Sequence, residues 1–161
     1  MSGVPPELPR DGELLSAAVK AVRKHRGMTT AEVASAMNMA LRTYERFESG
    51  ATRLNLDHIH RFAAATNSDP YALILSVVIG SSELARRCAD NKMATILTVA
   101  IQRFDQAIQD RLMDLDARTL ITAITGMFDT LLDGDETSEQ AQAWLQTGAA
   151  ELLSKRPKPG R

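Results

Sequence analysis

One face of a short predicted helix carries side chains that could contact nucleic-acid bases. In residues 28–50, MTTAEVASAMNMALRTYERFESG, two short helices flank a tight turn of about three residues. The second helix is expected to leave four side chains exposed: Leu41, Arg42, Glu45 and Arg46. A helix fits the major groove of DNA, where arginine can donate two hydrogen bonds to guanine O6 and N7. Leu41 could contact a thymine methyl group, or instead a protein partner.

Small and apolar residues are expected to hold these two helices together. The helices must cross steeply, and Ala34 lies where a larger side chain would keep their backbones apart. The remaining apolar residues of the segment supply the packing between them: Val33, Met37, Met39, Tyr44 and Phe47.

Local signals set the ends of the helices in the first half of the chain. Thr29 followed by Glu32 is a capping-box pattern, and Asn38 tolerates the left-handed conformation that a tight turn needs. Gly50 ends the second helix of the pair, after about Glu48. The apolar spacing also predicts an earlier helix over residues 13–25 and two later ones. Their predicted caps are Asn55, and Ser68 or Asp69 ahead of Pro70.

The second half of the chain is also predicted to be helical. Apolar residues recur every three to four positions from Met93, which predicts an amphipathic helix of about twenty residues. Asp116 is the predicted cap of another helix, which ends at Gly134, and Thr137 or Ser138 begins a last one. No alternating strand pattern is present, so we expect an all-α fold.

The formal charge of −1 conceals two halves of opposite sign. From Lys20 to Arg61 eight basic residues stand against four acidic ones, whereas from Glu83 to Leu153 twelve acidic residues stand against six basic ones. Attraction to phosphates supplies most non-specific affinity for DNA. The first half is therefore where a DNA-binding surface is expected.

Residues 14–74 resemble the lambda-repressor/Cro type of helix-turn-helix, also called XRE-type. The resemblance rests on Arg23 in the first helix, Ala34 after an apolar residue, the Phe47–Gly50 ending F-E-S-G, and the following helix with Leu56 and Phe62-Ala63. It implies a five-helix DNA-binding domain in which residues 40–48 form the recognition helix. Base readout then falls on Leu41, Arg42, Glu45 and Arg46.

The resemblance also implies two further sets of residues. Contacts with the DNA backbone would come from Thr29, Thr30, Thr43, Ser49 and Arg53, and a structural ion pair would join Arg23 to Glu48. Two positions depart from the family pattern. Thr30 replaces the usual Gln, which shortens a polar reach toward DNA, and Ala40 replaces a capping Ser or Thr, which costs about 1 kcal/mol of helix stability.

We expect four segments along the chain. These are a flexible N-terminal arm (1–12), the DNA-binding domain (13–80), a helical, bundle-like dimerisation or regulatory domain (81–153), and a basic mobile tail (154–161). The dimerisation residues are expected to be Ile96, Ala100, Phe104, Ile124, Phe128 and Trp144. Two alternatives, which do not exclude dimerisation, are that these apolar stripes form a simple core or line a ligand pocket between helices.

These expectations combine into a dimeric repressor that binds an inverted-repeat operator. An alternative is an adaptor or antitoxin-like module whose C-terminal helices capture a partner protein. The single Cys88 cannot form a disulfide within the chain, which favours a reducing, intracellular compartment. We expect a cytoplasmic, nucleoid-associated protein that is bacterial or phage-encoded.

Other classes of function find little support. His58 and His60 are two residues apart, so on a helix they point about 200° away from each other and cannot share a metal ion. No catalytic motif, phosphate-binding loop or membrane-spanning segment occurs, so we expect no enzyme activity, no cofactor and no membrane partner.

Overall fold

Helices and turns make up the part of the chain described by this computed structural model, residues 10–134, 142–144, 146–150 and 154. No strand occurs among these residues, so the predicted all-α fold is confirmed. Most of the predicted N-terminal arm and basic tail lies outside the described residues. The first helix begins at Asp11, so residues 11 and 12 belong to a helix and not to an arm.

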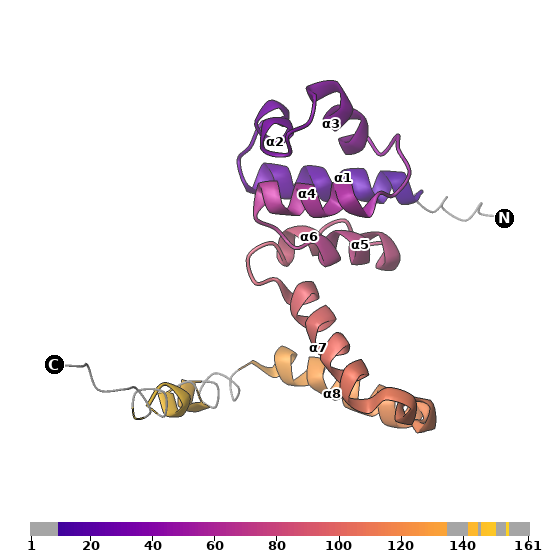
Figure 1. The fold of residues 1–161 in the computed structure, drawn as a ribbon, viewed down its shortest axis with the longest axis vertical. Coiled ribbons are helices and arrows are strands. Elements are labelled where there is room, and N and C mark those ends of the chain that lie inside the picture. The colour runs from indigo at the N-terminus through magenta and orange to yellow at the C-terminus, as the bar shows by residue number, and fades with distance from the viewer. Residues whose placement is uncertain (1–9, 135–141, 145, 151–153, 155–161) are drawn as a thin grey trace, which may run out of the picture. The chain divides into compact units, whose positions relative to one another are not determined.

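The helices follow one another in the order drawn in Figure 1. They are α1 (Asp11–His25), α2 (Thr30–Ala36), α3 (Leu41–Glu48), α4 (Leu56–Thr66), α5 (Pro70–Ile79), α6 (Leu84–Arg87), α7 (Met93–Ile108), the 3-10 helix η1 (Gln109–Asp114) and α8 (Ala117–Asp133).

The predicted caps form at the start of these helices. The Thr29 hydroxyl accepts a hydrogen bond from the Glu32 N–H at 3.1 Å, and the Glu32 carboxylate accepts one from the Thr29 N–H at 3.0 Å. Asn55 caps α4 by accepting from the His58 N–H at 3.2 Å. Of the two candidates for the cap of α5, Asp69 is the one that serves.

The first compact unit, Met1–Ala107, is built around α1. Within it α2 and α3 pack together, α3 lies against α1, and α5 and α6 pack against each other and against α1 (Figure 1). Its largest fully buried apolar side chains come from the five helices α1 to α5 and converge between them: Tyr44, Phe47, Phe62, Ile59, Leu73, Val19, Val22 and Val33.

The first unit continues beyond the Gly80–Ser82 boundary that the sequence suggested. Ala85, Cys88, Ala89 and Ala94 are all buried, because α6 and the first turn of α7 pack onto the preceding helices. Sequence reasoning did not predict α6. The division between compact units falls later, between Ala107 and Ile108.

The second unit, Ile108–Arg161, begins where the long predicted helix is interrupted. Gln109 adopts a left-handed φ of 49°, so α7 ends at Ile108 and gives way to η1. Asp116 caps α8 by accepting from the Thr119 N–H at 2.7 Å, and Gly134 follows its last residue. The predicted start of a last helix at Thr137 or Ser138 lies outside the described residues, whereas residues 142–144 and 146–150 are helical.

Candidate nucleic-acid interface

The inner face of α3 fixes this helix against the domain core. Phe47 and Glu48 lie three and four residues after Tyr44, on the same side of the helix, and all three residues are buried. The Phe47 ring lies 6.1 Å from the Tyr44 ring and 5.9 Å from the Phe62 ring on α4, measured between centroids. Burial raises the pKa of the Tyr44 phenol well above its ordinary value, so this side chain stays neutral at physiological pH.

An ion pair joins α3 to α1. The Arg23 guanidinium donates to Glu48 through Nε, at 3.1 and 3.0 Å from the two carboxylate oxygens, and through Nη2 at 2.8 Å. Its Nη1 donates to the carbonyl of Met28 at 3.1 Å, in the turn before α2. The hydrogen bonds that Arg23 donates to the Glu48 carboxylate raise the pKa of its guanidinium. The ion pair that the resemblance implied is thus present, and it holds three helices in register.

A second arginine holds the turn between α2 and α3. Asn38 has a left-handed φ of 51°, as predicted for this turn, and Ala34 is buried where the helices cross. Arg61 on α4 donates to the carbonyl of Met37 and, at 3.3 Å, to that of Asn38. Sequence reasoning counted Arg61 only as a positive charge, because no local pattern connects it to a turn more than twenty residues earlier.

The outer face of α3 is exposed. Leu41 is 43% exposed. The same face includes four further exposed residues: Arg42, Thr43, Glu45 and Arg46. Within the described part of the chain, the guanidinium groups of Arg42 and Arg46 form no hydrogen bond or ion pair. Both therefore remain able to bind another molecule.

The polar residues that flank this face are placed at helix ends. Thr29 and Thr30 begin α2, and the Thr29 hydroxyl is already used in the capping box. Ser49 follows α3, and its hydroxyl donates to the Arg46 carbonyl at 2.8 Å. Ala40 provides no side-chain cap to α3, as expected from its departure from the family pattern.

A close backbone contact brings the loop after α3 to the start of α1. A Cβ atom added to Gly50 would lie 2.1 Å from the carbonyl oxygen of Gly12, and Gly50 has a left-handed φ of 73°. Only glycine fits this approach. Arg53, which is exposed, lies in the same loop and borders a shallow hollow between the loop and the first turn of α1.

The residues predicted to form a dimer are all exposed within the chain. Ile96, Ala100 and Phe104 lie on α7, and Ile96 is 61% exposed. In the second unit Ile124 and Phe128 lie on α8, which buries none of its residues, and Trp144 is 77% exposed.

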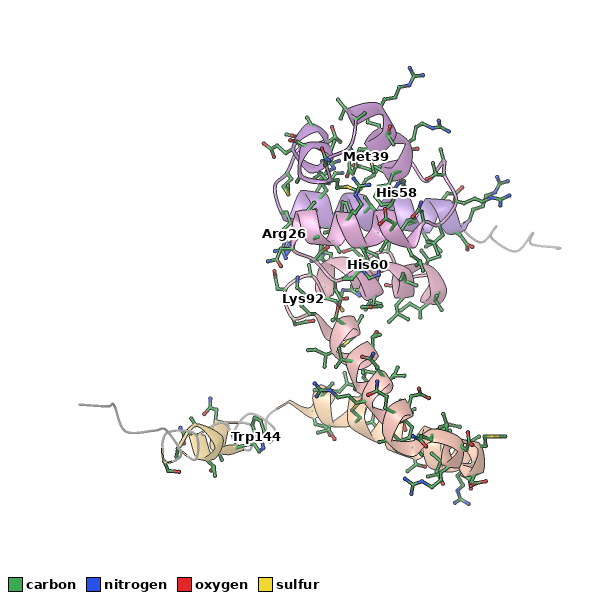
Figure 2. The ribbon with its side chains drawn as sticks, in the orientation of Figure 1. Arg26, Met39, His58, His60, Lys92 and Trp144 are labelled. Atoms are coloured by element: carbon green, nitrogen blue, oxygen red, sulfur yellow. The ribbon has the colours of Figure 1, made fainter. Side chains whose placement is uncertain are left out.

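The two histidines of α4 contact different helices. The His58 ring lies edge-on to Phe47 of α3 at 5.7 Å, and the His60 ring lies edge-on to Tyr71 of α5 at 5.6 Å (Figure 2). Among the described residues no group of three or more potential metal ligands occurs. None of the described helices has the length and apolar character needed to span a bilayer. Cys88 is buried, and burial raises the pKa of its thiol.

Comparison with known proteins identifies a helix-turn-helix segment within the first unit. Residues 19–73 match the family model described as helix-turn-helix. A search of curated proteins and a search of solved structures gave no match. The match includes α2, α3 and the turn between them, so the resemblance to the lambda-repressor or XRE type is confirmed. Residues 19–73 therefore form a helix-turn-helix domain of the kind found in DNA-binding transcription regulators.

Proposed function

We propose that this protein is a dimeric, sequence-specific repressor that binds an inverted-repeat operator through α3. The observation that carries this proposal is the division of α3 into two faces. Its inner face is locked by Tyr44, Phe47 and the Glu48–Arg23 pair, whereas Arg42 and Arg46 on its outer face have no partner among the described residues. A rigid helix with unpaired guanidinium groups suits base readout in the major groove.

The residues around α3 would hold the DNA backbone. Thr43 is exposed on α3 itself, and Arg53 is exposed on the loop that Gly50 begins. The Thr29 hydroxyl accepts from the Glu32 N–H and can still donate to a phosphate. The Ser49 hydroxyl and the backbone N–H groups of Thr29 and Ser49 already donate within the protein, so we expect weaker phosphate contacts from them. Thr30 is half-buried, so we expect its hydroxyl to contribute less to phosphate binding than the exposed residues of this set.

Two copies are needed because one helix-turn-helix reads too few base pairs to find a single genomic site. We assign the exposed apolar side chains of α7, and those of α8, to contacts with a second copy of the chain. On α8 they lie three and four residues apart, in the spacing of a helix-packing stripe: Ile121, Ile124, Phe128 and Leu131. The acidic second half would be repelled by DNA, which favours an orientation with α3 toward the duplex.

DNA binding is tested by selecting duplexes from a random pool with the full chain and then measuring affinity on the selected sequence and on a scrambled one. Arg42→Ala and Arg46→Ala should each weaken specific binding by about 1–3 kcal/mol and change scrambled-DNA binding much less. Arg87→Ala is a matched control, because Arg87 is an exposed arginine on α6. Equal losses on both duplexes would reject base readout by that arginine.

Dimerisation is tested by measuring the mass of the chain in solution by light scattering or sedimentation. Phe128→Glu, which places a charge on the α8 stripe, should shift the wild-type dimer to monomer, and Asp129→Glu next to it should not. A monomeric wild type would contradict the dimer. It would favour the alternative that these helices capture a different protein.

A further inference from the structure

The first turn of α7 is bonded to the helix-turn-helix domain through one buried carboxylate. Asp69 is fully buried and lies 25 residues before the first turn of α7 that it contacts. Its Oδ2 accepts hydrogen bonds from the N–H groups of Ala94 at 2.9 Å and Thr95 at 3.1 Å. Its Oδ1 accepts from the Thr95 hydroxyl at 2.7 Å.

The same carboxylate also caps α5. Oδ1 accepts from the N–H groups of Tyr71 at 3.2 Å and Ala72 at 3.3 Å. Asp69 therefore serves two helix N-termini at once, whereas Asp116 caps only α8. A buried carboxylate that accepts five hydrogen bonds holds both helix ends in one fixed relation.

The segment between α6 and α7 is held as well. Arg26, at the end of α1, donates to the carbonyls of Thr66 at 2.8 Å and Asn67 at 2.7 Å, and its Nη1 lies 2.7 Å from the Asp90 carboxylate. Lys92 donates to the carbonyls of Asn67 and Ala89, and Figure 2 shows Arg26 and Lys92 on the same edge of the domain. The segment is therefore not a free linker.

Together with the Arg23–Glu48 pair, these contacts form a series of ion pairs and hydrogen bonds that connects α3 to α7. Glu48 of α3 is bonded to Arg23 of α1, and Arg26, three residues further on, is bonded to the segment that leads into α7. All of these residues belong to the same compact unit. The direction in which α7 leaves the domain is thus fixed relative to the recognition helix.

We propose that Asp69 is a positioning residue that restricts the protein to one spacing between the two halves of its operator. This inference rests on the proposed dimer. Each added base pair moves a half-site by about 3.4 Å and turns it by about 34° around the duplex axis. If α7 leaves the domain in a fixed direction and the two copies are joined through its exposed residues Ile96, Ala100 and Phe104, they cannot follow that rotation, and the second recognition helix misses its half-site.

The experiment uses the full chain and a series of duplexes that carry two selected half-sites. The spacer between half-sites is the selected length, or is longer or shorter by one, two or five base pairs. The wild type should lose about a hundredfold in affinity away from the selected spacing, because simultaneous engagement is lost when geometry forbids it. A duplex with one half-site gives the reference affinity.

Asp69→Asn places an amide where the Ala94 and Thr95 N–H groups need an acceptor. It should reduce the loss at altered spacings to within about tenfold, while affinity for one half-site stays unchanged. Asp116→Asn is the matched control at the cap of α8, and it should keep the wild-type spacing preference. Helicity and melting temperature report whether each variant folds.

Thr95→Pro decides the question if Asp69→Asn does not fold. It removes both the N–H and the hydroxyl that Thr95 donates, leaves the cap of α5 intact, and introduces proline only in a first helical turn, where proline is tolerated. The inference is overturned if the wild type binds all spacings with similar affinity, or if both folded variants keep its strict preference. A chain that selects only single half-sites would instead contradict the dimer, and one that selects no sequence would contradict the proposed function itself.

Discussion

The guanidinium of Arg23 and the carboxylate of Glu48 meet through three contacts of 2.8–3.1 Å, with only 16% and 6% of their side chains exposed. The pair lies between α1 and the inner face of α3. It therefore sets the position of a helix whose outer face is the candidate DNA-binding surface.

Removing one partner of this pair should destabilise the domain. Glu48→Ala leaves a largely buried guanidinium without its counter-charge, and we expect a loss of about 3 kcal/mol in the free energy of unfolding. Urea denaturation followed by circular dichroism measures it. Glu83→Ala is the control, because it breaks the exposed pair with Arg86 and should cost less than about 1 kcal/mol. Similar losses for the two variants would contradict a structural role for the Arg23–Glu48 pair.

The contact between Gly12 and Gly50 predicts a large difference between two glycine substitutions. Gly50 and Gly80 have nearly the same φ, 73° and 70°, but a Cβ on Gly50 meets the Gly12 carbonyl whereas one on Gly80 meets nothing within 4 Å. Gly80→Ala should cost about 1 kcal/mol through backbone conformation alone, and Gly50→Ala should cost at least about 1 kcal/mol more. Equal melting temperatures for the two variants would rule out a tight approach at Gly50.

Arg53 should contribute to DNA affinity without contributing to sequence choice. Arg53→Ala is expected to weaken binding to selected and scrambled duplexes alike and to reduce the slope of log K against log salt by about 1. Fluorescence anisotropy across a salt series gives both quantities. An unchanged slope would place Arg53 away from the phosphates, and Arg87→Ala again supplies the value for an arginine outside the interface.

Burial of Tyr44 predicts a loss of stability in alkali. Its folded pKa is raised, so the unfolded phenol releases its proton first, near pH 10, and the unfolded state is favoured as pH rises above that value. The free energy of unfolding should fall by up to about 1.4 kcal/mol per pH unit above pH 10. Tyr44→Phe should show a shallower decline than the wild type, and Tyr71→Phe, at a half-buried tyrosine of α5, should not.

Local signals explain why the helix ends could be predicted from the sequence. Thr29, Asn55, Asp69 and Asp116 cap helices through N–H groups only two or three residues ahead, so each cap is visible in a short window of sequence. The outer face of α3 could be predicted for a related reason. Its exposed residues are those that the apolar spacing of Tyr44 and Phe47 leaves over.

Contacts between distant residues explain what the sequence did not reveal. Asp69 is one of the two residues, with Ser68, that the sequence offers as the cap of α5, but its bonds to Ala94 and Thr95 join residues 25 and 26 positions apart. The same holds for Arg26, which bonds to Asp90, 64 residues later, in the segment that follows α6. The end of α7 at Ile108 was missed because the next residue, Gln109, is neither glycine nor proline, although its φ is left-handed.

The exposure of α8 has a consequence for how the chain folds. A helix of 17 residues with no fully buried side chain gains little from the packing that stabilises most protein helices, and alone in water such a helix is marginal. In the proposed dimer, contact with the second copy would supply the stabilisation that this helix lacks in the single chain. The helical signal and protease resistance of residues 117–133 should therefore decline as the protein is diluted, at concentrations where the helix-turn-helix domain remains fully folded.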